Sequence, residues 1–147
     1  MRIRDAAPAE TALLEALQRR SSNVWDEYRE RLAVNPDAIE LAQTFVDNGW
    51  VRVAVDSGGT PVGFAVVIPA VAGVHELDGL FVEPAQMHCG IGRALVQDAC
   101  RRAQAAGALL LEVVAGPARG FYEKLGFELV ATAETRFGPA VRLRRRL

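Results

Sequence analysis

The sequence predicts an α/β fold in which helices pack against a mixed sheet. Short valine-rich runs typical of strands alternate with longer stretches in which apolar residues recur at helical spacing. Half of the 147 residues are hydrophobic and the net charge is −1, which indicates a globular chain with a sizeable core and argues against disorder. No repeat, low-complexity linker or break in composition divides the chain, so we expect a single domain over residues 1–147.

The first third of the chain is predicted to form a short strand and two helices. Residues 2–4 read as the strand and residues 8–20 as the first helix. The residues expected on the buried face of this helix are Leu13, Leu14 and Leu17. Asn35 and Pro36 favour the start of a second helix, because proline suits the first helical position, and Gly49 favours its end. The residues expected to point inward from this second helix are Ile39, Ala42 and Val46.

The rest of the chain is predicted to supply six strands and two helices. The runs 50–56 and 61–68, joined by Ser-Gly-Gly-Thr, indicate a hairpin, and a third strand follows at about 74–82. The next helix is expected to end at Gly107. The apolar residues at its helical spacing are Ile91, Leu95, Ala99, Ala103 and Ala106. The remaining elements are a strand at 108–114, a short helix at 117–126 and strands at 127–134 and 140–147, which gives the order βααβββαβαββ.

Gly90 and Gly92 lie between a predicted strand and a predicted helix, where glycine costs chain entropy and therefore needs a reason. The first N–H groups of a helix have no helical partner, and the helix dipole adds partial positive charge, so phosphate oxygens could approach two such glycines closely. A plain structural turn is the alternative. Leu95 occupies a position where a dinucleotide fingerprint needs a small residue, which argues against NAD although Glu112 lies near the expected distance. No Gly-Lys-Ser/Thr follows, so a P-loop is excluded.

Two segments resemble the GCN5-related N-acetyltransferases, the GNAT superfamily. Residues 87–92, Met-His-Cys-Gly-Ile-Gly, are similar to the signature Gln/Arg-x-x-Gly-x-Gly/Ala that cradles the pyrophosphate of acetyl-CoA, and residues 118–127 are similar to the block that closes the acetyl-CoA site. With the order of elements, the resemblance covers nearly the whole chain and implies a GNAT-type fold with a mostly antiparallel sheet. The cofactor-binding residues that it implies are Met87, His88, Cys89, Gly90, Ile91, Gly92 and Arg93 in the loop, and Phe81 and Val82 on the strand before it.

The sequence departs from this family at two positions. Met87 stands where Gln or Arg is usual, and Ala115 where Asn is common, so a donor to the phosphate is lost on the Met87 side. A non-catalytic acyl-CoA-binding module of the same fold therefore stays open as an alternative. A nucleotide-binding regulatory domain that uses the same glycines is the other alternative.

Acetyl transfer to an amine needs a base for the ammonium, donors for the developing oxyanion and an acid for the leaving thiolate. The family pattern Glu-Leu-x-x-Leu-Tyr/Phe-Val-x-Pro implies Glu76 as the base, and strand alternation places Asp78, the second candidate, on the same face. Tyr122 matches the family tyrosine that faces the sulfur of CoA and is the candidate acid, with simple packing as its alternative. Phe121 is assigned to the core. A covalent relay through Cys89 lacks an evident base partner.

The acceptor site is expected under the first two helices, with Arg20, Trp25 and Tyr28 as candidate residues. An arginine beside aromatic rings could bind a carboxylate or phosphate on a small amine, whereas a solvated helix face is the alternative. In the C-terminal segment that contains Arg-Leu-Arg-Arg-Arg, arginines alternate with the apolar residues Val141 and Leu143, as in an outer strand. We therefore predict no nucleic-acid partner. A homodimer is possible, because two-fold dimers are the commonest assembly.

Other functional classes are excluded by simple counts. No apolar run approaches the length of about 20 residues that spans a bilayer, and no secretory signal opens the chain, so we expect a cytoplasmic protein without a membrane partner. Cys89 and Cys100 give no disulfide framework, and with His75 and His88 they lack metal-ligand spacing. Cys100 is expected to pack on a helix face. The sequence thus predicts an acetyl-CoA-dependent N-acetyltransferase of an unidentified, small amine, without a metal.

Overall fold

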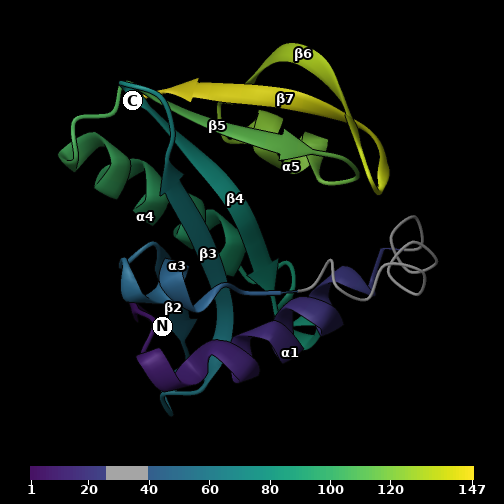
Figure 1. The fold of residues 1–147 in the computed structure, drawn as a ribbon. Helices are drawn as coiled ribbons and strands as arrows, with labels where there is room; N and C mark the ends of the chain where they lie inside the picture. Colours follow the sequence, from purple (N-terminus) through teal and green to yellow (C-terminus); the bar gives the residue numbers. More distant parts are fainter. Residues whose placement is uncertain (26–39) are drawn as a thin grey trace.

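The computed structural model describes residues 1–25 and 40–147, which contain a seven-stranded sheet in the order β1-β2-β3-β4-β5-β7-β6. Its strands are β1 (Arg2–Asp5), β2 (Val51–Val55), β3 (Pro61–Pro69), β4 (Val74–Val82), β5 (Leu110–Ala115), β6 (Glu128–Thr135) and β7 (Gly138–Arg146). Only β4 and β5 pair in parallel, and every other neighbouring pair of these strands is antiparallel (Figure 1). The predicted fold class, α/β with a mixed and mostly antiparallel sheet, is therefore confirmed.

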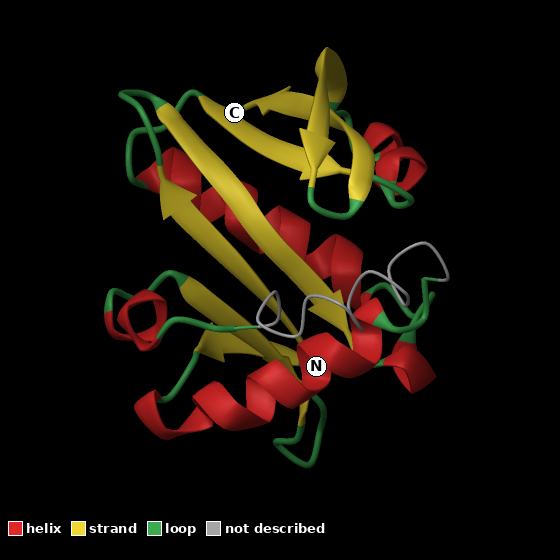
Figure 2. Cartoon of the chain, turned by 45° about the vertical axis from the view of Figure 1, so that its right-hand side comes forward, coloured by secondary structure: helices red, strands yellow, loops and turns green. Residues whose placement is uncertain are grey.

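Helices cover both faces of this sheet (Figure 2). They are α1 (Thr11–Ser22), α3 (Gln43–Asp47), α4 (Ile91–Ala105) and α5 (Arg119–Lys124), with short 3-10 helices η1 (Pro8–Glu10) and η3 (Pro84–Gln86). The buried side chains accordingly form two clusters. One cluster joins α4 and α5 to the central and later strands, and the other joins α1 and α3 to β2 and β3.

Helix α1 buries a narrower stripe than its leucines predict. Leu14 and Leu17 are completely buried, and the same stripe continues to Ser21, seven residues after Leu14. Leu13 was expected beside them but is 49% exposed. A helix that contacts a sheet along one line buries the i, i+3 and i+7 positions, so a residue one step away turns about 100° toward solvent.

The second predicted helix agrees with the structure only in its later part. Its predicted start at Asn35 and Pro36 lies outside the described residues, and so does Ile39. Helix α3 begins at Gln43, because Ala42 has extended backbone (φ −65°, ψ 130°) and is exposed rather than inward-facing. Val46 is buried as predicted. Gly49 takes a left-handed conformation (φ +74°) just after the helix, which agrees with its predicted role at the end.

Helix α4 matches the predicted apolar spacing except at its end. Ile91, Leu95, Ala99 and Ala103 are buried, and so is Cys100, which packs on a helix face as expected. Ala106 is exposed, because it caps the helix instead of continuing it.

Close contact between β3 and the start of α4 requires a glycine at position 63. A Cβ atom built on Gly63 would lie 2.9 Å from the carbonyl oxygen of Phe81 and 3.0 Å from Cγ2 of Ile91. We expect Gly63→Ala to lower the free energy of unfolding by about 1–3 kcal/mol, since overpacking shifts the backbone. Urea unfolding measures this effect, with Gly58→Ala as the control, because its built Cβ meets only Asp56 Oδ1, at 3.4 Å. Equal stability of the two variants would contradict the proposed packing.

Candidate functional site

The sheet opens between its two parallel strands. β4 and β5 pair only over Val74–Leu77 and Leu110–Val113. Beyond these residues β4 stays paired with β3 up to Val82, while β5 stays paired with β7. In Figure 1 the two strands form the arms of a V that opens toward their carboxyl ends. The splay, which the sequence alone did not reveal, leaves one side of the last residues of β4 without a neighbouring strand in the described part of the chain.

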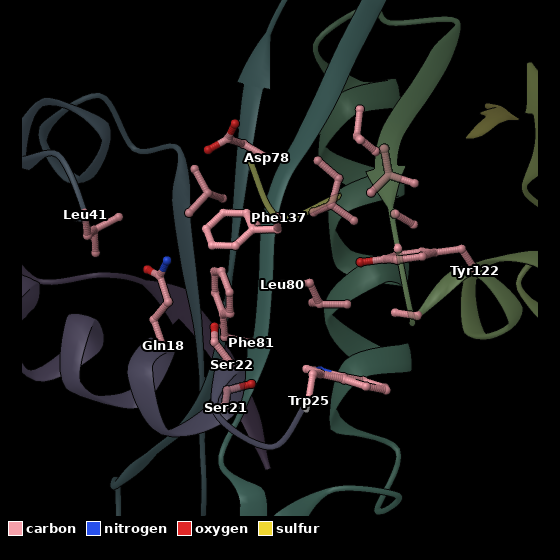
Figure 3. A pocket seen from close by; sticks show the side chains of 18 of the residues that line it. Gln18, Ser21, Ser22, Trp25, Leu41, Asp78, Leu80, Phe81, Tyr122 and Phe137 are labelled. Carbon is pink, nitrogen blue, oxygen red and sulfur yellow. The ribbon is translucent and has the colours of Figure 1, made fainter. Parts of the chain in front are cut away.

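A cavity of about 350 Å³ occupies this opening (Figure 3). The second half of β4, the end of β5 and Tyr122 of α5 form one part of its wall. The end of α1, the segment that leads into α3, and Phe137 form the other part. The cavity therefore reaches through the sheet to the face that α1 covers. Among the described residues that line the cavity, the charged ones are Asp78 and Glu40, and both are acidic.

A bulge at Asp78 separates the two candidate carboxylates. Val67 lies opposite Leu77 and Val66 opposite Gly79, so Asp78 is the extra residue on β4. Its carboxylate lines the cavity, and partial burial raises the pKa of Asp78 above its ordinary value. Glu76 lies opposite Glu112 in the paired part of the sheet and is not among the residues that line the cavity.

The hydroxyl of Tyr122 points into the cavity, toward Leu80 (Figure 3). Its ring is buried and makes edge contacts with Phe121 and Phe127, with centroids 5.1 and 5.5 Å apart. The ring of Tyr122 is therefore packed in the core while its hydroxyl group extends into the cavity. Tyr122 thus faces the edge of β4 from which β5 has diverged.

The amides of β4 alternate between β3 and the cavity side. The amide of Glu83 donates to the carbonyl of Val62 on β3, whereas the amide of Val82 donates to Oγ of Ser21 at 3.3 Å. Since strand amides alternate in direction, the amide of Phe81 points toward β3 and the amide of Leu80 toward the opening. Leu80 was not singled out from the sequence, because the direction of an amide depends on register.

The loop before α4 leaves the start of this helix uncapped. Gly90 is the N-cap with φ +83°, and it has no side-chain capping hydrogen bond. Ala94 is the first residue whose amide bonds back to Gly90, so the amides of Ile91, Gly92 and Arg93 have no partner within the helix. His88 also has a positive φ, +65°, which is unusual for a residue with a side chain. The side chains of His88, Cys89 and Arg93 are exposed, that of Met87 is half-buried and that of Ile91 is buried.

Gly92 keeps this helix start open beside an aromatic ring. A Cβ atom there would lie 3.3 Å from the ring of Phe121 and 3.7 Å from Val82. Phe121, which the sequence assigned to the core, is instead 37% exposed. This difference arises because its neighbour Tyr122 takes the inward direction on the short helix α5.

The three candidate acceptor residues differ in their positions. Trp25 lines the cavity, whereas Arg20 lies outside the lining and forms a two-bond ion pair with Glu83, at 2.8 and 2.7 Å. Tyr28 lies outside the described residues. Phe137 also lines the cavity, although the sequence analysis did not identify it as a site residue. A phenylalanine in the tight turn between two strands is the signal that could have drawn attention to it.

Within residues 1–25 and 40–147, no group of three His, Cys, Asp or Glu side chains is arranged to hold a metal ion. Over the same ranges, no helix has the length and apolar character to cross a membrane.

This chain has the fold of N-acetyltransferases whose structures are solved. Among solved structures, the PaiA N-acetyltransferase from Thermoplasma acidophilum in complex with coenzyme A superposes with a TM-score of 0.80 at 20% identity, covering 99% of this chain and 98% of that one. The chain belongs to the acetyltransferase (GNAT) family, which matches residues 11–127. The resemblance found in the two sequence segments is thereby confirmed.

Two curated relatives carry the name peptidyl-lysine N-acetyltransferase YjaB. The Escherichia coli protein is 33% identical over 108 residues, 74% of this chain and 65% of its own length, just under two thirds. The Salmonella typhimurium protein is 31% identical over 132 residues, 90% of this chain and 86% of its own length. The solution structure of apo YjaB from Escherichia coli has a TM-score of 0.67 at 27% identity, covering 99% of this chain and 95% of that one.

Proposed function

We propose that this chain transfers the acetyl group of acetyl-CoA directly to a primary amine. The observation that carries the proposal is the opening between β4 and β5, where the Tyr122 hydroxyl, the Leu80 amide and the Asp78 carboxylate border one cavity. The name of the YjaB relatives favours the lysine side chain of a peptide as the acceptor, and a small alkylamine is the second candidate.

The residues around the opening fit acetyl-CoA. The uncapped amides of Ile91, Gly92 and Arg93 supply N–H donors and the positive end of a helix dipole, which suit a pyrophosphate. Because these donors belong to the backbone, Met87 does not weaken them. The side of β4 that lacks a neighbouring described strand can hydrogen-bond the amide-containing arm of acetyl-CoA, and the thioester of acetyl-CoA would then lie near Tyr122.

The residues around the opening can supply the base, the oxyanion donor and the acid that acetyl transfer needs. The Asp78 carboxylate accepts a proton from the ammonium of the acceptor, so that the amine nitrogen can form its new bond to the acetyl carbon. The Leu80 amide donates to the oxygen on which negative charge develops. As the carbon–sulfur bond breaks, the Tyr122 hydroxyl donates a proton to the sulfur, and the second proton that the nitrogen loses on becoming an amide restores this hydroxyl through solvent. Glu76, the residue that the family pattern implied as the base, lies two residues before Asp78 and is the alternative.

Binding of the donor is tested by thermal unfolding with acetyl-CoA, CoA, NAD and ATP in parallel. At 100-fold excess over its dissociation constant a ligand adds about 2.7 kcal/mol, which for this chain length means a rise in Tm of roughly 9 °C. We expect this rise with the two CoA compounds alone. It should disappear in Gly92→Val, whose side chain would crowd Phe121 at the helix start.

Gly120→Ala is the matched control for the Gly92→Val variant. A Cβ atom at Gly120 meets nothing within 4 Å, and the backbone has no positive φ there, so ligand binding should persist. A rise with NAD or ATP only would overturn the acetyltransferase proposal. Binding of acetyl-CoA without acetylation of any amine in a broad panel would favour the non-catalytic alternative.

A further inference from the structure

The part of the cavity that Asp78 borders receives one side chain from the hairpin of β6 and β7. Phe137 belongs to the turn between these strands, yet it lines the same cavity as Asp78 and Phe81 on β4. In the view of Figure 3 the ring of Phe137 lies between the carboxylate of Asp78 and the ring of Phe81. Phe81 is itself fixed by a ring contact with Phe64, with centroids 5.1 Å apart. Two aromatic rings and a carboxylate therefore border the same part of the cavity.

Thr135 fixes the turn that carries Phe137. Its Oγ1 accepts a hydrogen bond from the amide of Phe137 at 3.1 Å and donates one to the carbonyl of Gly138 at 2.9 Å. Thr135 and Gly138 are the last pair of the hairpin, and Gly138 has φ +112°, a conformation that favours glycine. These two bonds fix the backbone from which the Phe137 side chain projects, which makes Thr135 a positioning residue.

The charge on the described lining of the cavity favours a cation. Among its described lining residues, the charged ones are Asp78 and Glu40, and neither Lys nor Arg is present. Arg20, the candidate for binding an anionic group, is engaged with Glu83 outside this lining. Aromatic faces attract ammonium groups, and carboxylates repel a second carboxylate brought into the same cavity.

We propose that Phe137 is a specificity-determining residue of the acceptor site. Together with Phe81 and Asp78 it selects acceptors in which an ammonium ends an unbranched alkyl chain, and it disfavours amines with an adjacent carboxylate. The methylene groups pack on the rings and the ammonium meets Asp78, whereas the carboxylate of a free α-amino acid would lie against Asp78. This inference rests on the proposed function for its catalytic readout.

The test uses two acceptors that differ by one group. Pentylamine and norleucine share an alkyl chain, but norleucine carries a carboxylate on the carbon that bears the amine. We expect kcat/KM to be at least about tenfold higher for pentylamine, and Nα-acetyl-lysine methylamide to behave like pentylamine. Norleucine amide, which lacks the negative charge, should recover part of the loss.

Variants of the turn assign the effect to Phe137. Phe137→Ala should raise KM for pentylamine about 3- to 30-fold with little change in kcat, the range expected for losing an aromatic contact to a cation. Phe137→Leu keeps an apolar side chain at this position, so it should raise KM for pentylamine less than Phe137→Ala does. Thr135→Val keeps the ring but removes both turn hydrogen bonds, so we expect an intermediate KM.

Titration calorimetry separates this inference from the proposed function, because it measures binding of pentylamine without transfer. Binding by the wild-type protein that weakens in Phe137→Ala supports the inference even if no acetyl group is transferred. In that case only the proposed activity fails. Equal use of norleucine and pentylamine, or unchanged KM and Kd for pentylamine in folded Phe137→Ala, would overturn the inference while leaving acetyl transfer intact.

Discussion

Tyr122→Phe is expected to lower kcat by about 100- to 1000-fold, within the usual range for removing a general acid. Tyr122→Phe keeps the ring and its contacts with Phe121 and Phe127, so we expect the fold to persist. The dissociation constant of acetyl-CoA should change little, because the uncapped start of α4 is untouched. Steady-state kinetics together with donor binding measured by calorimetry check both expectations.

A variant that disturbs packing near this tyrosine is the control. Phe121→Leu alters the neighbouring ring, which is 37% exposed, and leaves the Tyr122 hydroxyl in place. We expect it to alter kcat far less than Tyr122→Phe does. Unchanged turnover in Tyr122→Phe would remove the hydroxyl from the mechanism and leave the residue a packing role.

Asp78→Asn is expected to lower kcat by about 100-fold or more and to remove the acidic limb of the pH–rate profile. Burial raises the pKa of Asp78, so the wild-type rate should rise with pH through a value above that of an ordinary aspartate, as the base becomes ionised. Glu76→Gln is the matched control, because it neutralises a carboxylate on the same strand outside the cavity lining. If Glu76→Gln abolishes the acidic limb instead, the base is Glu76.

The same aspartate gives a prediction for stability with a definite sign. A pKa that is higher in the folded than in the unfolded state means that folding disfavours the carboxylate. Stability contributed by the protonated form is therefore lost as pH rises from about 4, the unfolded value, through the folded value. Asp78→Asn should consequently be more stable than wild type at neutral pH, and this difference should vanish below pH 4. A Tm series over pH measures it.

Local patterns predicted most of the architecture. The valine-rich runs predicted β2, β3 and β4, and Tyr122, which its motif made the candidate acid, lines the cavity. Leu13 and Ala42 were misplaced because the exact width and start of a buried helix stripe depend on what the helix packs against.

The candidate site was less predictable for a physical reason. The bulge at Asp78 and the direction of the Leu80 amide follow from the register of β4 against β3, which no single strand specifies. Phe137 enters the cavity from a hairpin more than 50 residues away in sequence, so only the tertiary fold joins it to Asp78. The motifs thus specify a candidate donor side in more detail than a candidate acceptor side.

The short pairing of β4 with β5 has a mechanical consequence. In the described part of the sheet, only the pairs from Val74–Leu110 to Leu77–Val113 join β4 to β5. The last of these pairs continues to Leu143 on β7, so that Leu77, Val113 and Leu143 form one buried row within the cluster that includes α4. We expect the angle between the two halves of the sheet to depend on how tightly the apolar side chains of this row pack. The stiffness of the opening would then be a property of the hydrophobic layer behind it.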